Sequence, residues 1–130
     1  MSLRDNIIGA WELVSMVSID TSTGEERRPF GTAPRGLIVY TSDGHMSAQL
    51  AESDMSGYVA YGGRFSVNEN TASIHHDVMI SMMPELLARP QFRDASVDGD
   101  ELTLSTTTTD DAGMESRSSL VWRRTAAPGD

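Results

Sequence analysis

The sequence contains no cysteine, so disulfide bonds and thiolate chemistry are excluded. Basic residues are scarce: 10 Lys and Arg stand against 19 Asp and Glu, which gives a formal net charge of −9. A chain this acidic repels phosphate backbones and anionic lipid surfaces, so neither nucleic acid nor a membrane is an expected partner. No apolar run approaches the ~18 residues of a membrane span, and the start, "MSLRDNIIGAW", is too polar for a secretory signal. These absences predict a cytoplasmic location.

Long helical patterns and the common catalytic motifs are missing as well. Only residues 2–8 and 83–90 could form a helical turn or two, and Pro84 and Pro90 bound the second segment. The sequence has no glycine-rich phosphate loop, no Gly-x-Ser-x-Gly elbow and no His-Glu-x-x-His zinc helix. We therefore expect neither a cofactor nor a metal.

Short β-forming runs make up most of the 130 residues, which is enough material for one domain spanning 1–130. The runs recur about every ten residues with turn-forming residues between them, a spacing typical of an all-β sandwich or barrel. They cover residues 11–19, 35–40, 45–50, 64–67, 71–81, 91–97, 101–107 and 115–124. We expect an antiparallel β-barrel of about 8–10 strands with short helical segments. Whether "ERRPF" (26–30) or "YVAYGG" (58–63) adds a strand stays open.

Six segments, in order over nearly the whole chain, form a recognisable set: "GAWELVS", "PRGLIVYTSDGHMSAQ", "YGGRFSV", "HHDV", "DGDELTLST" and "LVWRR". This set resembles the bacterial and fungal lipocalin-like domain family, a calycin-type β-barrel. The resemblance implies an up-and-down barrel with a central cavity. It also implies that Trp11 closes one end of the barrel beneath Arg123 or Arg124. Barrels of this general type include carriers and cofactor-free cyclases or isomerases of natural-product pathways.

The adjacent histidines of "ASIHHDVMI" (72–80) cannot share a site in an extended strand, because successive side chains point to opposite faces. One face is apolar apart from its histidine: Ala72, Ile74, His76, Val78 and Ile80. We expect this face to turn inward, which leaves His75 outside near Asp77. A reversed register would turn His75 and Asp77 inward as an oriented base or as two metal ligands. A His76 that is merely packed is the structural alternative.

The candidate site residues fall into two groups. For catalysis we expect His76, Tyr40, Tyr61 and Arg64, because an imidazole can move a proton near neutral pH and phenol or guanidinium groups can hold a developing oxyanion. The expected ligand contacts are Trp11, Gln49, Tyr58, Phe65, His75, Met79, Phe92 and Arg93. Ordinary packing or surface pairing explains most of these residues equally well when each is taken alone.

Three functions remain open at this point. The protein could bind a small hydrophobic or aromatic metabolite in the barrel. It could use the same cavity as a cofactor-free isomerase, cyclase or dehydratase with His76 as proton shuttle. It could also be a protein-interaction module with a filled barrel. The sequence does not decide between a monomer and a homodimer.

Overall fold

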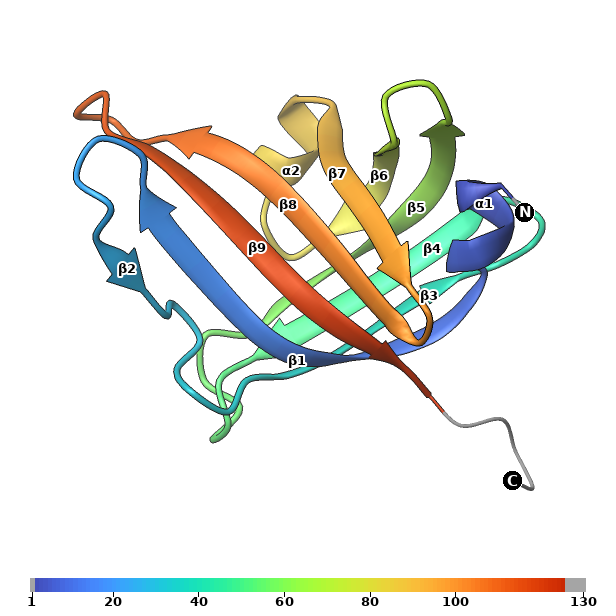
Figure 1. Cartoon of the computed structure of the whole chain (residues 1–130), viewed down its shortest axis with the longest axis horizontal. Helices are drawn as coiled ribbons and strands as arrows, with labels where there is room; N and C mark the ends of the chain where they lie inside the picture. The colour runs from blue at the N-terminus through green and yellow to red at the C-terminus, as the bar shows by residue number, and fades with distance from the viewer. Residues whose placement is uncertain (1, 126–130) are drawn as a thin grey trace.

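The described part of the chain, residues 2–125 of a computed structural model, consists almost entirely of antiparallel strands (Figure 1). Two short helices accompany them, α1 (Leu3–Ile7) and α2 (Glu85–Ala88). The strands are β1 (Gly9–Asp20), β2 (Glu26–Arg27), β3 (Arg35–Tyr40), β4 (His45–Ala51), β5 (Val59–Asn68), β6 (Ser73–Ser81), β7 (Gln91–Asp98), β8 (Glu101–Thr109) and β9 (Glu115–Arg124). The predicted fold class and both predicted helical segments are confirmed.

Eight strands close into a barrel because β1 pairs with both β3 and β9. Its first residues, Gly9 to Glu12, pair with β3, and residues Trp11 to Asp20 pair with β9. The remaining barrel strands follow one another in chain order, as an up-and-down barrel requires. The segment "ERRPF" contributes only the two-residue β2, which joins the edge of β1, and "YVAYGG" belongs to β5 rather than to a separate strand.

The turn-forming segments "TSDG", "NEN" and "DGD" lie in the hairpins that connect β3 to β4, β5 to β6 and β7 to β8. Gly44 takes a φ of 91° in the first of these turns, a conformation that glycine adopts without steric cost. Short connections of this kind set the register of each strand pair. Side chains along the regular parts of β3 to β6 therefore alternate between the barrel interior and the outer face.

A bulge in β1 reverses this alternation half-way along the strand. Leu13 pairs with Trp122 and Ser15 pairs with Val121, so Val14 is an extra residue on β1. Beyond the bulge Ser18 is buried inside the barrel and Ile19 is 44% exposed. An extra residue shifts the period of two by one position, and this shift brings a polar side chain into the interior.

A second irregularity changes the orientation of Ile80 on β6. Gly62 pairs with Ile80 while Gly63 pairs with Val78, which leaves Met79 unpaired between them. Ile80 is 73% exposed, so the expectation that it faces inward with His76 is wrong. Gly63 accommodates the bulge, because a Cβ at this position would collide with the carbonyl oxygen of Asp77.

One end of the barrel is closed by Trp11 and α1, which lies across that end in Figure 1. The Trp11 indole is fully buried and donates a hydrogen bond to the Ile7 carbonyl oxygen at 2.9 Å. The Arg124 guanidinium lies 4.1 Å from the centre of the Trp11 ring and donates to the carbonyl oxygens of Ile8 and Asn6 at 2.9 and 2.6 Å. The basic residue expected over Trp11 is therefore Arg124, whereas Arg123 faces solvent.

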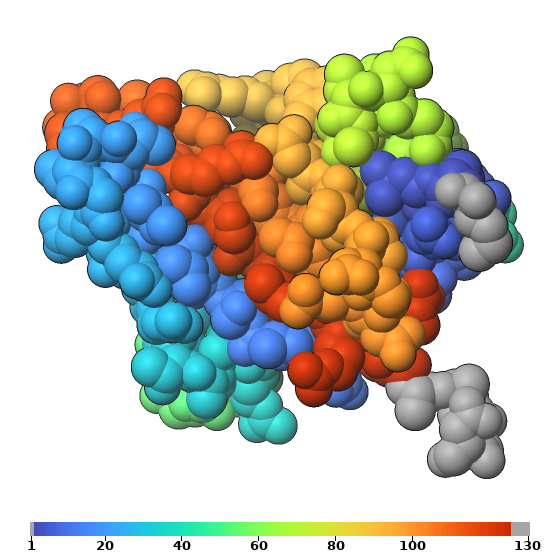
Figure 2. Space-filling view, in the orientation of Figure 1, coloured from blue at the N-terminus to red at the C-terminus, as the bar shows by residue number. Residues whose placement is uncertain are grey.

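The other end is open because strand pairing stops early around β7. Only Ser73 to His76 of β6 pair with β7, and β8 pairs with β7 only as far as Ser105. The short helix α2 lies beside β6 where the two strands separate. Figure 2 shows a hollow between the α2 segment and β8 on this face. Within residues 2–125, no helix has the length and apolar character needed to cross a membrane.

We predict that Arg124→Ala lowers the free energy of unfolding by about 2 kcal/mol, because charged hydrogen bonds and a cation–π contact are lost together. Urea denaturation measures the change. The neighbouring Arg123→Ala, which removes an outward-facing side chain, is the matched control and should stay within about 0.5 kcal/mol of the wild type. Equal losses in both variants would contradict the proposed role of Arg124.

Candidate functional site

The centre of the candidate site is His76, which β6 places inside the barrel with 1% of its surface exposed. Tyr40 on β3 and Tyr61 on β5 approach its ring from the neighbouring strands. The Tyr40 hydroxyl lies 2.6 Å from Nε2, and the Tyr61 hydroxyl lies 3.2 Å from Nδ1. The prediction that His76 points inward is confirmed, and both ring nitrogens have a tyrosine partner.

The burial of Tyr40 fixes which nitrogen carries the proton. Tyr40 is 1% exposed, and the only hydrogen-bond partner of its hydroxyl within residues 2–125 is His76. If Nε2 were protonated, the Tyr40 proton would lack an acceptor, which is costly for a buried group. Tyr40 therefore donates to Nε2, and Nδ1–H donates to the Tyr61 oxygen. This arrangement leaves the Tyr61 hydroxyl proton available for another acceptor.

The electrostatics of this cluster keep all three side chains neutral. Burial lowers the pKa of His76 to about 3, and the electrostatic interactions with Arg93 and His75 act in the same direction. Burial also raises the pKa of Tyr40 well above its ordinary value. Burial raises the pKa of Tyr61 too, although Arg93 opposes that rise. A neutral imidazole with this pKa is a weak base at physiological pH.

Arg93 and Gln91 extend the cluster along β7. Both residues share the inward face of the strand with Ala95, which is 7% exposed. The Arg93 guanidinium donates to the Phe92 carbonyl oxygen at 2.9 Å and to the Gln91 amide oxygen at 3.4 Å. A cation and an amide thus stand beside the two tyrosines at the point where β6 and β7 separate.

A pocket of about 260 Å³ reaches His76 from the side of α2. Its lining consists of residues 75–78 on β6 and residues 86–90 in and after α2. This volume is just below the ~300–1,000 Å³ of typical ligand pockets, so it suits a small occupant. Of the cluster residues, His76 is the one that lines this pocket, which lies between β6 and the segment around α2.

Two further polar features of the interior have no obvious sequence signal. The hydroxyls of Ser18 on β1 and Ser118 on β9 lie 2.7 Å apart, and both residues are buried. The indole nitrogen of Trp122 is the buried polar side-chain atom without a hydrogen-bond partner among residues 2–125. Such an unpaired donor commonly contacts a water molecule or a ligand.

Five of the predicted site residues come together in the interior. They are His76, Tyr40, Tyr61, Phe65 and Arg93. Phe65 packs edge-on against Tyr40 with 4.9 Å between ring centres. Trp11 is also inside, but it is fully covered at the closed end, where it holds α1 and Arg124. Its position suits closure of the barrel rather than ligand contact.

The other predicted site residues lie on the outer face, away from this cluster. Gln49 and Tyr58 line a pocket of about 350 Å³ together with Arg35 and Met55. His75 stacks on Phe92 with 4.7 Å between ring centres, and both rings border another outer pocket. These four residues were expected at a cavity inside the barrel. The strand phase turns Gln49, His75 and Phe92 outward instead, and Tyr58 lies in the connection before β5.

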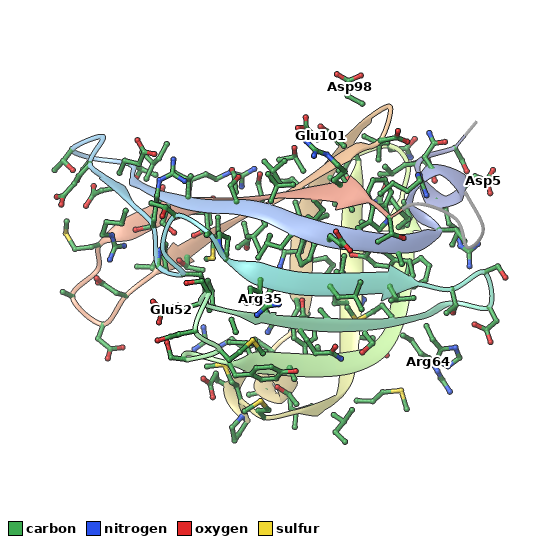
Figure 3. All side chains as sticks on the ribbon, turned by 90° about the horizontal axis from the view of Figure 1, so that it is seen from below. Asp5, Arg35, Glu52, Arg64, Asp98 and Glu101 are labelled. Carbon is green, nitrogen blue, oxygen red and sulfur yellow. The ribbon has the colours of Figure 1, made fainter. Side chains whose placement is uncertain are left out.

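Arg64 and Met79 are also outside the interior. Figure 3 shows the Arg64 side chain projecting from β5 away from the barrel, and the residue is exposed. Met79 is 60% exposed at the bulge of β6. Neither side chain is placed to contact a molecule held beside His76. Within the described residues, no group of three or more His, Cys, Asp or Glu side chains could hold a metal ion.

The sequence matches the lipocalin-like domain over residues 8–55 and 51–125, which is nearly its full length. The chain belongs to the lipocalin-like domain family. A curated relative, the 4'-hydroxy-3'-methoxypropiophenone carrier protein of Aspergillus oryzae, is 36% identical over 77 residues. That alignment covers 54% of this lipocalin-like chain and 69% of the relative. The barrel closure and the Trp11–Arg124 contact agree with the resemblance noted in the sequence.

We predict that the stability advantage of the wild type over His76→Gln shrinks as the pH falls. Above about pH 6.5 the histidine is neutral in both the folded and the unfolded chain. Between there and a folded pKa of about 3, only the unfolded chain binds the proton, so acidification favours unfolding. The difference should shrink by up to about 1.4 kcal/mol per pH unit.

Urea denaturation from about pH 7 to about pH 5 measures this slope. His75→Gln is the matched control, because it removes the neighbouring histidine from the outer face of the same strand. A wild-type advantage over His76→Gln that stays constant across this range would contradict a buried neutral ring. If the wild-type advantage over His75→Gln changed with pH by the same amount, the effect would belong to β6 in general rather than to His76.

Proposed function

We propose that this lipocalin-like protein binds a small apolar or aromatic molecule beside His76, in the open half of the barrel. The observation that carries this proposal is the Tyr40–His76–Tyr61 chain, in which one hydroxyl proton on Tyr61 has no acceptor within residues 2–125. The surrounding inward positions are apolar, and His76 itself lines the pocket beside α2. Sites of this composition bind a ligand through apolar contact and orient it with a few polar groups.

The relative from Aspergillus oryzae supports the same function, since its name describes it as a carrier of an aromatic ketone. An aromatic ketone has a flat apolar body and a carbonyl oxygen that accepts hydrogen bonds. The Tyr61 hydroxyl can donate to such an oxygen without disturbing the bonds made by His76. We therefore propose an aromatic compound with an acceptor oxygen as the class of ligand.

Turnover has less support than binding. A cofactor-free isomerase, cyclase or dehydratase would need a group that takes a proton near neutral pH. His76 has a pKa of about 3, and both of its nitrogens already have tyrosine partners. The tyrosines are poor acids because burial raises their pKa. The cluster is thus better suited to hold a ligand than to move its protons.

A filled barrel, as an interaction module would have, is also disfavoured. Two of the large side chains that could have filled it, Phe92 and Met79, are 57% and 60% exposed. The interior keeps polar groups at its open end instead, and these would be unfavourable in a core with no other role.

We predict that 4'-hydroxy-3'-methoxypropiophenone quenches the fluorescence of Trp11 and Trp122, which are both buried in the barrel. Tyr61→Phe should weaken its binding about threefold to tenfold, because one neutral hydrogen bond contributes roughly 0.5–1.5 kcal/mol. The matched control is Tyr58→Phe, which removes a hydroxyl from the outer pocket and should leave the affinity unchanged.

Two results would overturn the proposal. The first is a lack of saturable quenching by this ketone and by its close analogues. The second is a loss of affinity in Tyr58→Phe with none in Tyr61→Phe, which would move the ligand to the outer pocket that Tyr58 and Gln49 line.

A further inference from the structure

Arg93 is a cation on the inner side of the barrel, and the structure of residues 2–125 places no opposite charge beside it. Its guanidinium donates hydrogen bonds to two uncharged oxygens, the Phe92 carbonyl and the Gln91 amide. The ion pairs found among residues 2–125 do not include Arg93. A half-buried guanidinium is usually paired with a carboxylate or phosphate, because removal of an unpaired charge from water is costly.

The titratable side chains inside the barrel whose pKa responds to Arg93 cannot supply the missing charge. They are Tyr40 on β3, Tyr61 on β5 and His76 on β6, and each is neutral at physiological pH. The positive charge of Arg93 lowers the pKa of all three, in keeping with a position close to the cluster. The carboxylate adjacent on β7, Asp94, points outward and pairs with Arg117 at 2.7 Å.

Several hydrogen-bond donors of the interior have no acceptor among residues 2–125. The Tyr61 hydroxyl proton is not used by His76, the Arg93 guanidinium has further N–H groups, and the Trp122 indole N–H has no partner in the described chain. The acceptor nitrogen of His76 is already occupied by Tyr40. A ligand that accepts hydrogen bonds from these donors needs acceptor oxygens. A negatively charged ligand would form the strongest hydrogen bonds with them.

We propose that the barrel takes its ligand in anionic form: a small, mainly apolar molecule with an acidic oxygen, whose ionised oxygen lies between Arg93 and Tyr61. This inference rests on the proposed binding function and adds the charge state of the ligand to it. Arg93 supplies the opposite charge, Tyr61 donates the neutral hydrogen bond, and the neutral His76 holds Tyr61 in place. The net charge of −9 then repels anions from the rest of the surface, so selection depends on this one interior cation.

The test uses two probes of nearly the same shape, 4-nitrophenol and its methyl ether 4-nitroanisole. Only the phenol can ionise, and its anion is yellow. Binding is measured by tryptophan quenching, and ionisation by the visible absorbance of the bound phenol. An opposite charge within ~4–6 Å shifts a pKa by about one unit or more. We therefore expect the phenol to bind at least about tenfold more tightly than the ether, and to turn yellow at a lower pH when bound than when free.

Arg93→Gln should abolish this preference, so that both probes bind about equally. The bound phenol should then no longer turn yellow at a lower pH than the free phenol. Arg93→Lys keeps the charge and should retain a clear preference, which separates the loss of charge from a loss of folding. Arg123→Gln makes the same charge change on the outer face of β9 and should behave as the wild type.

Three outcomes would overturn the inference. If both probes bound the wild type equally and the phenol turned yellow at the same pH bound and free, the ligand would not be an anion. The proposed binding function would be unaffected. A preference for the phenol that survives in Arg93→Gln would place the anion elsewhere. Binding of neither probe would overturn both the inference and the proposed function.

Discussion

The hydrogen bonds of the buried His76 ring are the constraint on which the site depends. A histidine with 1% exposure needs a partner for each nitrogen, and Tyr40 and Tyr61 provide these from two other strands. The burial of Tyr40 then fixes the direction of every bond in the chain, because its proton has only one acceptor in residues 2–125. The consequence is a rigid, neutral cluster that ends in one available donor, the Tyr61 hydroxyl.

The two ends of the barrel differ in their packing and hydrogen bonding. At the closed end Trp11, Arg124 and α1 form a plug that is held by hydrogen bonds and a cation–π contact. These contacts stabilise the folded barrel. At the open end the pairing between β6 and β7 is short, and the buried His76 borders the pocket beside α2. The same early separation places Arg93 beside the tyrosines without a carboxylate partner. The plug thus stabilises one end of the barrel, and the proposed ligand site lies at the other end.

The sequence predicted the barrel, its hairpins and the inward turn of His76, since all three follow from turn residues and a period of two. The same period could have separated Phe92 from Arg93, because adjacent strand residues cannot both face the interior. The orientations of Ser18 and Ile80 could not be predicted from the sequence for another reason. The bulges at Val14 and Met79 shift the phase of β1 and β6, and they arise from pairing with β9 and β5. Local sequence does not determine a contact of that kind.

The protonation state of His76 is the central claim, and nitrogen-15 chemical shifts of its imidazole measure it directly. The account predicts a protonated Nδ1 and an unprotonated Nε2, with both shifts unchanged as the pH falls from about 7 to about 4. The shifts of Nε2 should also change little when Tyr61 is replaced by Phe, because Tyr40 is its partner. A titration centred near about pH 6.5, or a proton on Nε2, would contradict the neutral chain from which the ligand site is derived.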